Sequence, residues 1–380
     1  MKQSMLLMLC ALLWGPQSLA IQAEPFLGAN YNESLERVNL SDLKRSQSSW
    51  ARGFIVYHHY QQGSRDLNTD PRVMGFQKLK KMGLNTVLSL KFNYQNRPFP
   101  ITQADIDQEL NFLPTLLDAL MPYADIVVAG NEPFIETEKS LRQQPLVRFY
   151  KQVAERIHQY QLANGYQQPL YLGAFNRLWE GGMQTDSAPL LALAKSLPWI
   201  AGVDLHIHHA SDEQFTTMID YALARLRPGQ HFIATEFSLM HHWRASLKQP
   251  VPADFAQHYQ RPESWQVYQY LDQVVNHQPV AREEWVAFLS ASPWFETRKH
   301  YIRDAMTRFG SYPQFAGATY GFYQTYGKRP FTDNRDPWIL NSLYSNQTVQ
   351  WQDGLPPFHY QFMQDYIDYQ VQTSSKGTQP

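Results

Sequence analysis

Two glutamates stand where apolar segments of the chain end. Glu132 follows the apolar residues 124–130, and Glu236 follows the apolar residues 231–235. A carboxylic acid can protonate a leaving oxygen and a carboxylate can attack an anomeric carbon, so a facing pair of carboxyl groups is the minimum needed to cleave a glycosidic bond. This chemistry is available only if the fold brings both groups to one site.

A pattern of short apolar strand, loop and amphipathic helix recurs along the 380 residues. Strands are predicted at 26–31, 52–58, 85–91, 124–130, 170–176, 202–208, 231–236 and 315–323, and helices at 34–44, 71–82, 102–121, 141–162, 188–196, 211–226 and 358–371. Eight strands in this alternation predict an α/β fold, a single-domain (β/α)8 TIM barrel. Residues 238–314 predict a long excursion after the seventh strand. The carboxyl ends of barrel strands form the active-site face, so Glu132 and Glu236 are expected to converge there.

The amino-terminal residues are typical of an export signal. Lys2 supplies a positive charge, and the apolar stretch that follows is too short to span a membrane. We expect cleavage after Ala23, a periplasmic or secreted protein without membrane attachment, a catalytic domain over 24–371, and a disordered tail over 372–380. Cleavage after Ala20 is the alternative.

Composition excludes several classes of protein. The only cysteine, Cys10, lies in the expected signal, so the mature chain has no disulfide, no cysteine nucleophile and no cysteine metal site. The net charge is −1, which gives no field that attracts nucleic acid. No G-x-S-x-G, Walker A or Rossmann glycine motif is present. We expect a monomer that binds no nucleic acid and acts on a carbohydrate.

The tripeptide Asn131-Glu132-Pro133 after a fourth strand, with Glu236 at the end of a seventh, resembles clan A of the retaining glycoside hydrolases, which are (β/α)8 barrels. The resemblance spans roughly residues 26–370. It implies that Glu132 is the acid/base, that Glu236 is the nucleophile, and that Asn131 binds the sugar's 2-hydroxyl. It also implies a β-linked poly- or oligosaccharide substrate and no cofactor. The choice between endo and exo action stays open.

Other residues near the predicted strand ends are candidates for lining the sugar site. His206 and His208 occupy alternate positions of the sixth strand, so both can face the barrel interior. Many clan members end strand eight with a tryptophan, but this chain has Tyr320, Phe322 and Tyr323 there, which leaves the family and the sugar platform undetermined. The remaining candidates are Tyr57, His58, Lys91, Asn93, Trp179, Trp243 and Tyr323.

Two other functions are compatible with these residues. The H-x-H spacing of His206 and His208 suits zinc, as in a metal-dependent hydrolase, although no further ligands follow in the usual order. A non-catalytic carbohydrate-binding barrel is the second. Chelation and cleavage assays distinguish both from a glycosidase, for which we expect no metal site.

Overall fold

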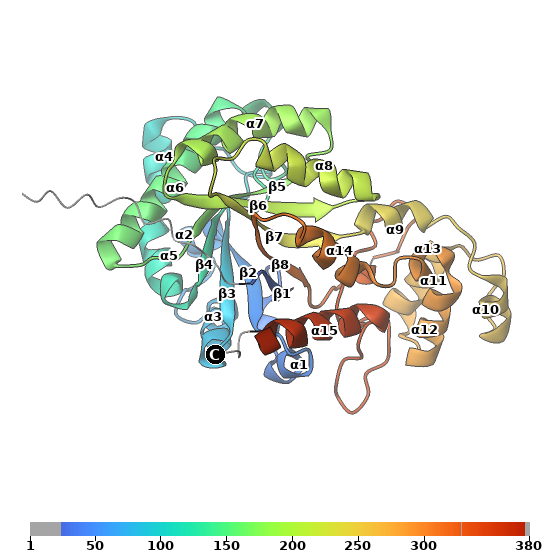
Figure 1. Cartoon of the computed structure of the whole chain (residues 1–380). Helices are drawn as coiled ribbons and strands as arrows, with labels where there is room; N and C mark the ends of the chain where they lie inside the picture. Colours follow the sequence, from blue (N-terminus) through green and yellow to red (C-terminus); the bar gives the residue numbers. More distant parts are fainter. Residues whose placement is uncertain (1–23, 328, 377–380) are drawn as a thin grey trace, which may run out of the picture.

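The computed structural model describes residues 24–327 and 329–376, which contain one closed barrel of eight parallel strands paired in chain order (Figure 1). The (β/α)8 prediction is confirmed. The expected export signal, residues 1–23, lies outside the described residues. The strands are β1 (Phe26–Asn30), β2 (Trp50–Val56), β3 (Asn85–Lys91), β4 (Ile126–Ala129), β5 (Leu170–Asn176), β6 (Ile200–His208), β7 (His231–Ser238) and β8 (Phe315–Gly321).

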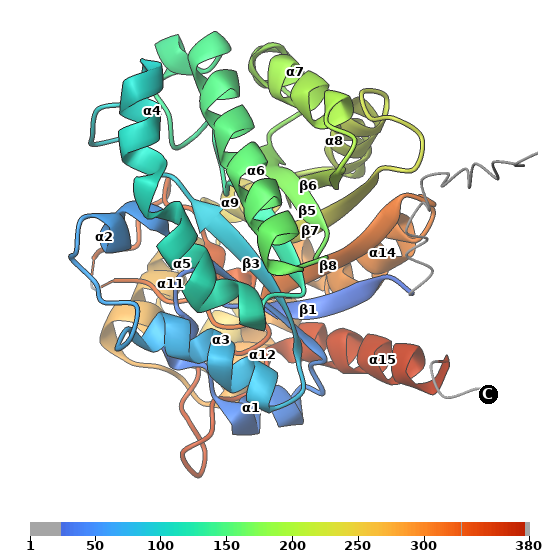
Figure 2. The ribbon, with the colours of Figure 1, turned by 90° about the vertical axis from the view of Figure 1, so that its left-hand side faces the viewer.

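Helices connect the strands and cover the outside of the barrel (Figure 2). The predicted helix at 102–121 is split into several short pieces, and Pro114 stands in the first turn of one of them. Thr102 and Asp105 form a capping box at its start. Up to β7 the helical segments are η1 (Leu35–Arg37), α1 (Leu40–Arg45), α2 (Tyr57–Gln61), α3 (Pro71–Lys81), α4 (Gln103–Glu109), η2 (Leu110–Phe112), α5 (Leu113–Leu120), η3 (Met121–Tyr123), η4 (Lys139–Leu141), α6 (Gln144–Asn164), α7 (Gly181–Ser196) and α8 (Asp212–Leu223).

The predicted excursion after the seventh strand is present. Its helical segments are α9 (Met240–Ser246), α10 (Ala253–His258), α11 (Val267–Asp272), η5 (Gln273–His277), α12 (Arg282–Ala291), α13 (Pro293–Glu296) and α14 (Tyr301–Phe309). Figure 1 shows α9 to α13 gathered at the end of the barrel toward which β6 and β7 point. That end carries the active-site face of such barrels, so the excursion borders it.

A second long connection follows β8 and contains the short helix η6 (Trp338–Leu340) before α15 (Tyr360–Lys376). The sequence did not indicate η6. Helix α15 packs against β1 and reaches Lys376, so the prediction of disorder from residue 372 is wrong over 372–376. Packing against the barrel stabilises an amphipathic helix, and this stabilisation lets the helix extend into a segment whose sequence is polar. Residues 377–380 lie outside the described part.

The barrel interior changes from apolar to polar along the strands. A small apolar cluster, separate from the main core, is made of Phe26, Val87, Ile126, Val128, Tyr171 and Ile233, all from barrel strands. Among the buried polar residues of the strands are Arg52, Ser89, Asp204, Thr235 and Thr319. Because buried polar groups require partners, this layer of polar side chains indicates where the functional groups of the barrel lie. Over the described residues, no helix combines the length and the apolar character needed to cross a bilayer.

Candidate active site

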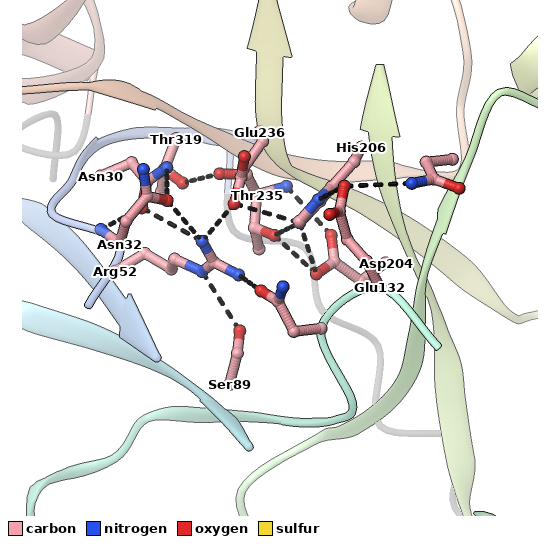
Figure 3. Close-up of polar contacts among 12 residues, drawn as sticks. Asn30, Asn32, Arg52, Ser89, Glu132, Asp204, His206, Thr235, Glu236 and Thr319 are labelled. Carbon is pink, nitrogen blue, oxygen red and sulfur yellow. Dashed lines mark hydrogen bonds and ion pairs between the residues drawn. The ribbon is translucent and has the colours of Figure 1, made fainter. Parts of the chain in front are cut away.

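The two predicted carboxylates meet at one imidazole. Glu132 lies just after β4 and Glu236 lies in β7, and His206 of β6 stands between them (Figure 3). His206 Nδ1 is 3.1 Å from Glu132 Oε1, and its Nε2 is 3.6 Å from Glu236 Oε1. The imidazole is fully buried, whereas the side chains of Glu132 and Glu236 are 24% and 17% exposed. Both carboxylates are therefore accessible from one side of a buried histidine.

Backbone irregularities bring these side chains inward. Between β6 and β7, Asp204 pairs with Ile233 and His206 pairs with Glu236, so three steps along β7 match two along β6. Such a bulge redirects side chains, and here the consecutive residues Thr235 and Glu236 both contact His206. At the end of β4, Gly130 has φ 121° and a Cβ there would lie 1.9 Å from the Gly173 carbonyl oxygen, so only glycine fits the turn that leads to Glu132.

Arg52 is the main site residue that sequence reasoning missed. It lies in β2 with no exposed side-chain surface, and its Nη1 donates to Glu236 Oε1 over 2.7 Å. The same Nη1 also donates to Asn30 Oδ1 and Asn32 Oδ1, whereas Nη2 donates to Asn131 Oδ1 and Nε donates to Ser89 Oγ (Figure 3). Burial would raise the pKa of Glu236, but His206, His208 and the Arg52 guanidinium together lower it well below its usual range. Glu236 is therefore ionised across the acidic and neutral range.

We expect Arg52→Gln to reduce turnover by roughly 10²-fold or more and to destabilise the fold by about 3–5 kcal/mol, because a buried anion loses its partner. The pKa of Glu236 should rise in this variant, so the acid limb of the pH–rate profile should move to higher pH. Thermal unfolding and the pH profile of kcat/KM measure both effects. Arg261→Gln, which removes another arginine paired with a buried glutamate, should leave the pH profile unchanged.

Asn131 is held from both sides of its amide. Its Nδ2 donates to Glu136 Oε1 over 2.9 Å, and its Oδ1 accepts from Arg52 Nη2 over 2.7 Å. Glu136 is buried and pairs with Lys91 Nζ at 3.2 Å. Burial raises the pKa of Glu136, and Lys91 and Asn131 oppose that rise. Lys91, a predicted sugar-site residue, therefore places its ammonium group on the carboxylate that orients Asn131.

Glu132 Oε1 accepts a second hydrogen bond from Asn176 Nδ2 at 3.0 Å. Asn176 is the last residue of β5. Its position at a strand end was the only feature of the sequence that could have indicated a role in the site. Burial acts to raise the pKa of Glu132, but the hydrogen bond and charge of His206 outweigh it and lower the pKa. For His206 burial acts to lower the pKa, and the surrounding carboxylates Glu236, Glu132 and Asp204 raise it instead. In the resting site the shared proton therefore lies on His206.

His208 approaches the second carboxylate oxygen of Glu236. Its Nε2 is 3.5 Å from Glu236 Oε2, and its Nδ1 is 2.8 Å from Ser238 Oγ. Its ring makes an edge contact with Trp338, with centroids 4.8 Å apart and planes at 81°. Trp338 belongs to η6, after β8, and is partly exposed. A tryptophan therefore lies beside His208, which contacts the candidate nucleophile. This tryptophan belongs to the connection after β8 and not to the strand itself.

Three predicted sugar-site residues direct their polar atoms to partners elsewhere in the protein, and two of them, Trp243 and Tyr57, are fully buried. Trp243 has no exposed surface, donates to Asn341 Oδ1 and stacks on Phe295, because α9 turns it toward the excursion. Tyr57 begins α2, since β2 ends at Val56, and it donates to the Glu109 carbonyl. Tyr323 is partly exposed and donates to Asp42 of α1. Trp243 and Tyr57 therefore offer no surface to a sugar, whereas the sugar-binding role of Tyr323 stays a prediction.

The other predicted residues lie at the surface of the same end of the barrel or near it. His58 lies in α2 against His59, and burial followed by the charge of His59 lowers its pKa to about 4. Asn93 accepts from the Gln95 amide and closes a turn. Trp179 is partly exposed and packs against His241 of α9, with ring centroids 5.4 Å apart. Of these, Trp179 offers an aromatic face, and it borders the excursion.

One group among the described residues has the geometry of a metal site. The ligand atoms of Glu132, His206 and His208 lie within 4.8 Å of one another. His206, however, has partners on both ring nitrogens, Glu132 on Nδ1 and the Thr235 hydroxyl on Nε2. A bound metal would have to break one of these hydrogen bonds.

Comparison with known proteins establishes the fold. No family model and no curated protein matches the sequence. The GH53 catalytic domain of Ignisphaera aggregans is 14% identical and superposes with a TM-score of 0.52 over 90% of each chain. The GH1 beta-glucosidase of Exiguobacterium antarcticum is 10% identical over 90% of this chain and 86% of its own, with a TM-score of 0.48. A family 30 xylanase of Clostridium acetobutylicum is 11% identical over 91% and 71%, with a TM-score of 0.45.

Proposed function

We propose that the protein is an exported retaining glycoside hydrolase that cleaves a β-linked poly- or oligosaccharide. The observation that carries the proposal is the convergence of Glu132 and Glu236 on His206, with Arg52 bonded to Glu236. One carboxylate is held ionised by a buried guanidinium, and the other shares a proton with an imidazole. Double displacement requires an ionised nucleophile and an acid that can deliver a proton; here Glu236 is the ionised carboxylate, and His206 holds the proton that Glu132 can pass on.

In the proposed reaction Glu236 attacks the anomeric carbon, and Arg52 and His208 hold its oxygens in place. Glu132 delivers a proton to the leaving oxygen as the glycosidic bond breaks, then takes a proton from the water that releases the sugar. Asn131, fixed by Glu136 and Arg52, keeps one amide hydrogen for the sugar's 2-hydroxyl. No step needs a cofactor.

Two partly exposed tryptophans favour a carbohydrate ligand. Trp338 lies beside His208, and Trp179 lies at the edge of the excursion against His241. Indole faces stack on the apolar faces of sugar rings. The name of the Ignisphaera aggregans domain, a GH53 catalytic domain, agrees with this assignment.

We expect Trp338→Ala to raise KM and to lower kcat/KM by about 10–100-fold, because removal of a stacking indole costs roughly 1–3 kcal/mol. Trp338→Phe should restore part of the loss. Initial rates on the best substrate measure both. Trp351→Ala is the control, since Trp351 is 55% exposed on the later part of the same connection and donates its indole N–H to the Asn346 carbonyl. Equal losses in both alanine variants would remove Trp338 from the sugar site.

The deciding experiment is incubation with β-glucans, mannans, xylans, galactans and algal polysaccharides, followed by product analysis. Proton NMR of the first product shows whether its anomeric configuration is retained. Retained β-product on any of these glycans supports the proposal. Inverted product overturns the double displacement, and binding without cleavage by pure protein indicates a carbohydrate-binding barrel.

A metal-dependent hydrolase is the second candidate, favoured by the 4.8 Å grouping of Glu132, His206 and His208. Its test is activity after exhaustive dialysis against a chelator. Full activity of metal-free protein excludes it, whereas loss of activity that zinc restores supports it.

A further inference from the structure

Behind His206 lies a buried hydrogen-bond chain that the double-displacement reaction by itself does not require. His206 Nε2 is 3.1 Å from Thr235 Oγ1, and the Thr235 hydroxyl donates to Asp204 Oδ2 over 2.6 Å (Figure 3). Asp204 Oδ1 also accepts from the Thr235 backbone amide at 3.0 Å. Asp204, Thr235 and His206 have no exposed surface. A buried chain of this kind fixes which atoms carry hydrogens.

The direction of the chain determines the state of the imidazole. The Thr235 hydroxyl donates its one hydrogen to Asp204. Its oxygen can therefore only accept a hydrogen bond from His206. His206 Nε2 must therefore carry a hydrogen. The remaining ring nitrogen, Nδ1, faces Glu132 Oε1, so one proton is shared across that 3.1 Å contact.

We propose that Asp204 and Thr235 are positioning residues that make the Glu132–His206 pair, and not Glu132 alone, the general acid/base of the site. This inference rests on the proposed function. Locking the tautomer of a catalytic imidazole through a buried carboxylate is a known device in other hydrolases, where amidation of that carboxylate costs about 10⁴-fold in kcat. Here a threonine stands between the carboxylate and the imidazole.

The proton balance closes over one turnover. At rest His206 carries hydrogens on both nitrogens and Glu132 is ionised. As Glu236 bonds to the anomeric carbon and the glycosidic C–O bond breaks, the Nδ1 proton passes to Glu132 and a proton leaves Glu132 for the departing oxygen. His206 is then neutral, with its hydrogen on Nε2. When water attacks the glycosyl-enzyme, Glu132 takes a proton from it and returns one to Nδ1.

Charges around His206 support this cycle. The acidic groups facing it are Glu132 from the turn after β4, Glu236 from β7 and Asp204 from β6, and together they raise its pKa above the ordinary value against the effect of burial. The other basic side chains nearby are His208 of β6, whose ring centroid is 6.0 Å away, and Arg52 of β2, which is bonded to Glu236. The pair therefore holds its proton to higher pH than an ordinary histidine does, and activity should fall as pH rises through the pKa of the pair.

The test compares Asp204→Asn with Thr235→Val and Thr235→Ser. In Asp204→Asn the new amide donates to Thr235, whose hydroxyl then donates to His206 Nε2, so the imidazole is neutral and holds its single hydrogen on Nδ1. We expect kcat/KM for phenyl β-glycosides of the preferred sugar to fall by about 10²–10⁴-fold. For the 2,4-dinitrophenyl glycosides, which need no acid, it should change less than about tenfold. Thr235→Val should behave in the same way, and Thr235→Ser should retain most activity.

Asp42→Asn is the matched control, because Asp42 is a buried carboxylate with partners outside the site. It should lower stability without changing leaving-group dependence. If Asp204→Asn and Thr235→Val show the same uniform loss on both glycosides, the residues are only structural and the proposal is overturned.

A second readout does not depend on turnover. In ¹⁵N-histidine NMR spectra, assigned with His206→Gln, the wild-type His206 should show two protonated ring nitrogens at neutral pH. Asp204→Asn and Thr235→Val should show a neutral ring. If both variants keep two protonated ring nitrogens on His206, then Asp204 and Thr235 do not set its protonation. That result overturns the proposal even if the protein is a glycosidase. A wild-type protein that cleaves no glycan refutes the proposed function, while the NMR result still decides the chain.

Discussion

Glu236→Gly is expected to lower turnover by roughly four to six orders of magnitude while the fold is kept, since loss of a covalent nucleophile has the largest effect of any single change at such a site. Glu236 is bonded to Arg52 at 2.7 Å and lies 3.5 Å from His208, so its carboxylate is both ionised and aimed. Removing it leaves the acid/base and the sugar contacts intact.

Azide should restore part of this activity. A small anion can occupy the space that the Glu236 carboxylate leaves and attack the anomeric carbon from the same face. The product is then a glycosyl azide of inverted, α configuration, which NMR identifies. Glu284→Gln is the control, because Glu284 is also buried and paired with an arginine but lies in α12. Near-normal turnover of Glu236→Gly without azide would exclude it as the nucleophile.

The strand–helix count predicted the barrel because each strand is a continuous apolar run closed by turn residues. The same count placed Glu132 and Glu236 at the carboxyl ends of β4 and β7, where the structure has them. Apolar periodicity can be read from short segments of the sequence. Once eight such strands close into a barrel, the carboxyl end of every strand lies on the same face. The two histidines of β6 follow from alternation alone, which puts both on one face of the strand.

Arg52 and Thr235 could not be assigned in this way. Arg52 is a charge inside an apolar strand, and two of the partners that explain its burial, Asn131 and Glu236, lie 79 and 184 residues away. Thr235 reaches His206 because of the bulge between β6 and β7, which is not visible in the composition of either strand. Long-range polar partners and register shifts depend on the assembled barrel.

The aromatic residues show the limit of reasoning by position. Trp243 and Trp338 both follow strands and both belong to helical segments after a barrel strand. The first packs against Phe295 and the second contacts His208, because the facing side of a short helix is set by what it packs on. A residue number near a strand end therefore predicts the right end of the barrel but not the direction of a side chain.

Glu132→Ala is the second large expected effect, and it should depend on the leaving group. For phenyl glycosides, which need a proton, we expect kcat/KM to fall by roughly 10³–10⁵-fold, since both the acid and the link to His206 are lost. For 2,4-dinitrophenyl glycosides the first step should be nearly unchanged. The second step still lacks a base, so a burst of dinitrophenol should precede slow turnover.

The pH profile and azide separate this result from a general loss of structure. The wild-type activity should fall as pH rises through the pKa of the Glu132–His206 pair, which the facing carboxylates hold above the ordinary histidine value. In Glu132→Ala that basic limb should disappear from the kcat/KM profile of the phenyl glycoside, because the residual reaction involves no proton transfer that titrates. Azide should enter on the acid/base side and yield a β-glycosyl azide, the opposite anomer to that from Glu236→Gly. The same anomer from both variants would mean that the two carboxylates do not flank the sugar, and the assigned roles of Glu132 and Glu236 would then be wrong.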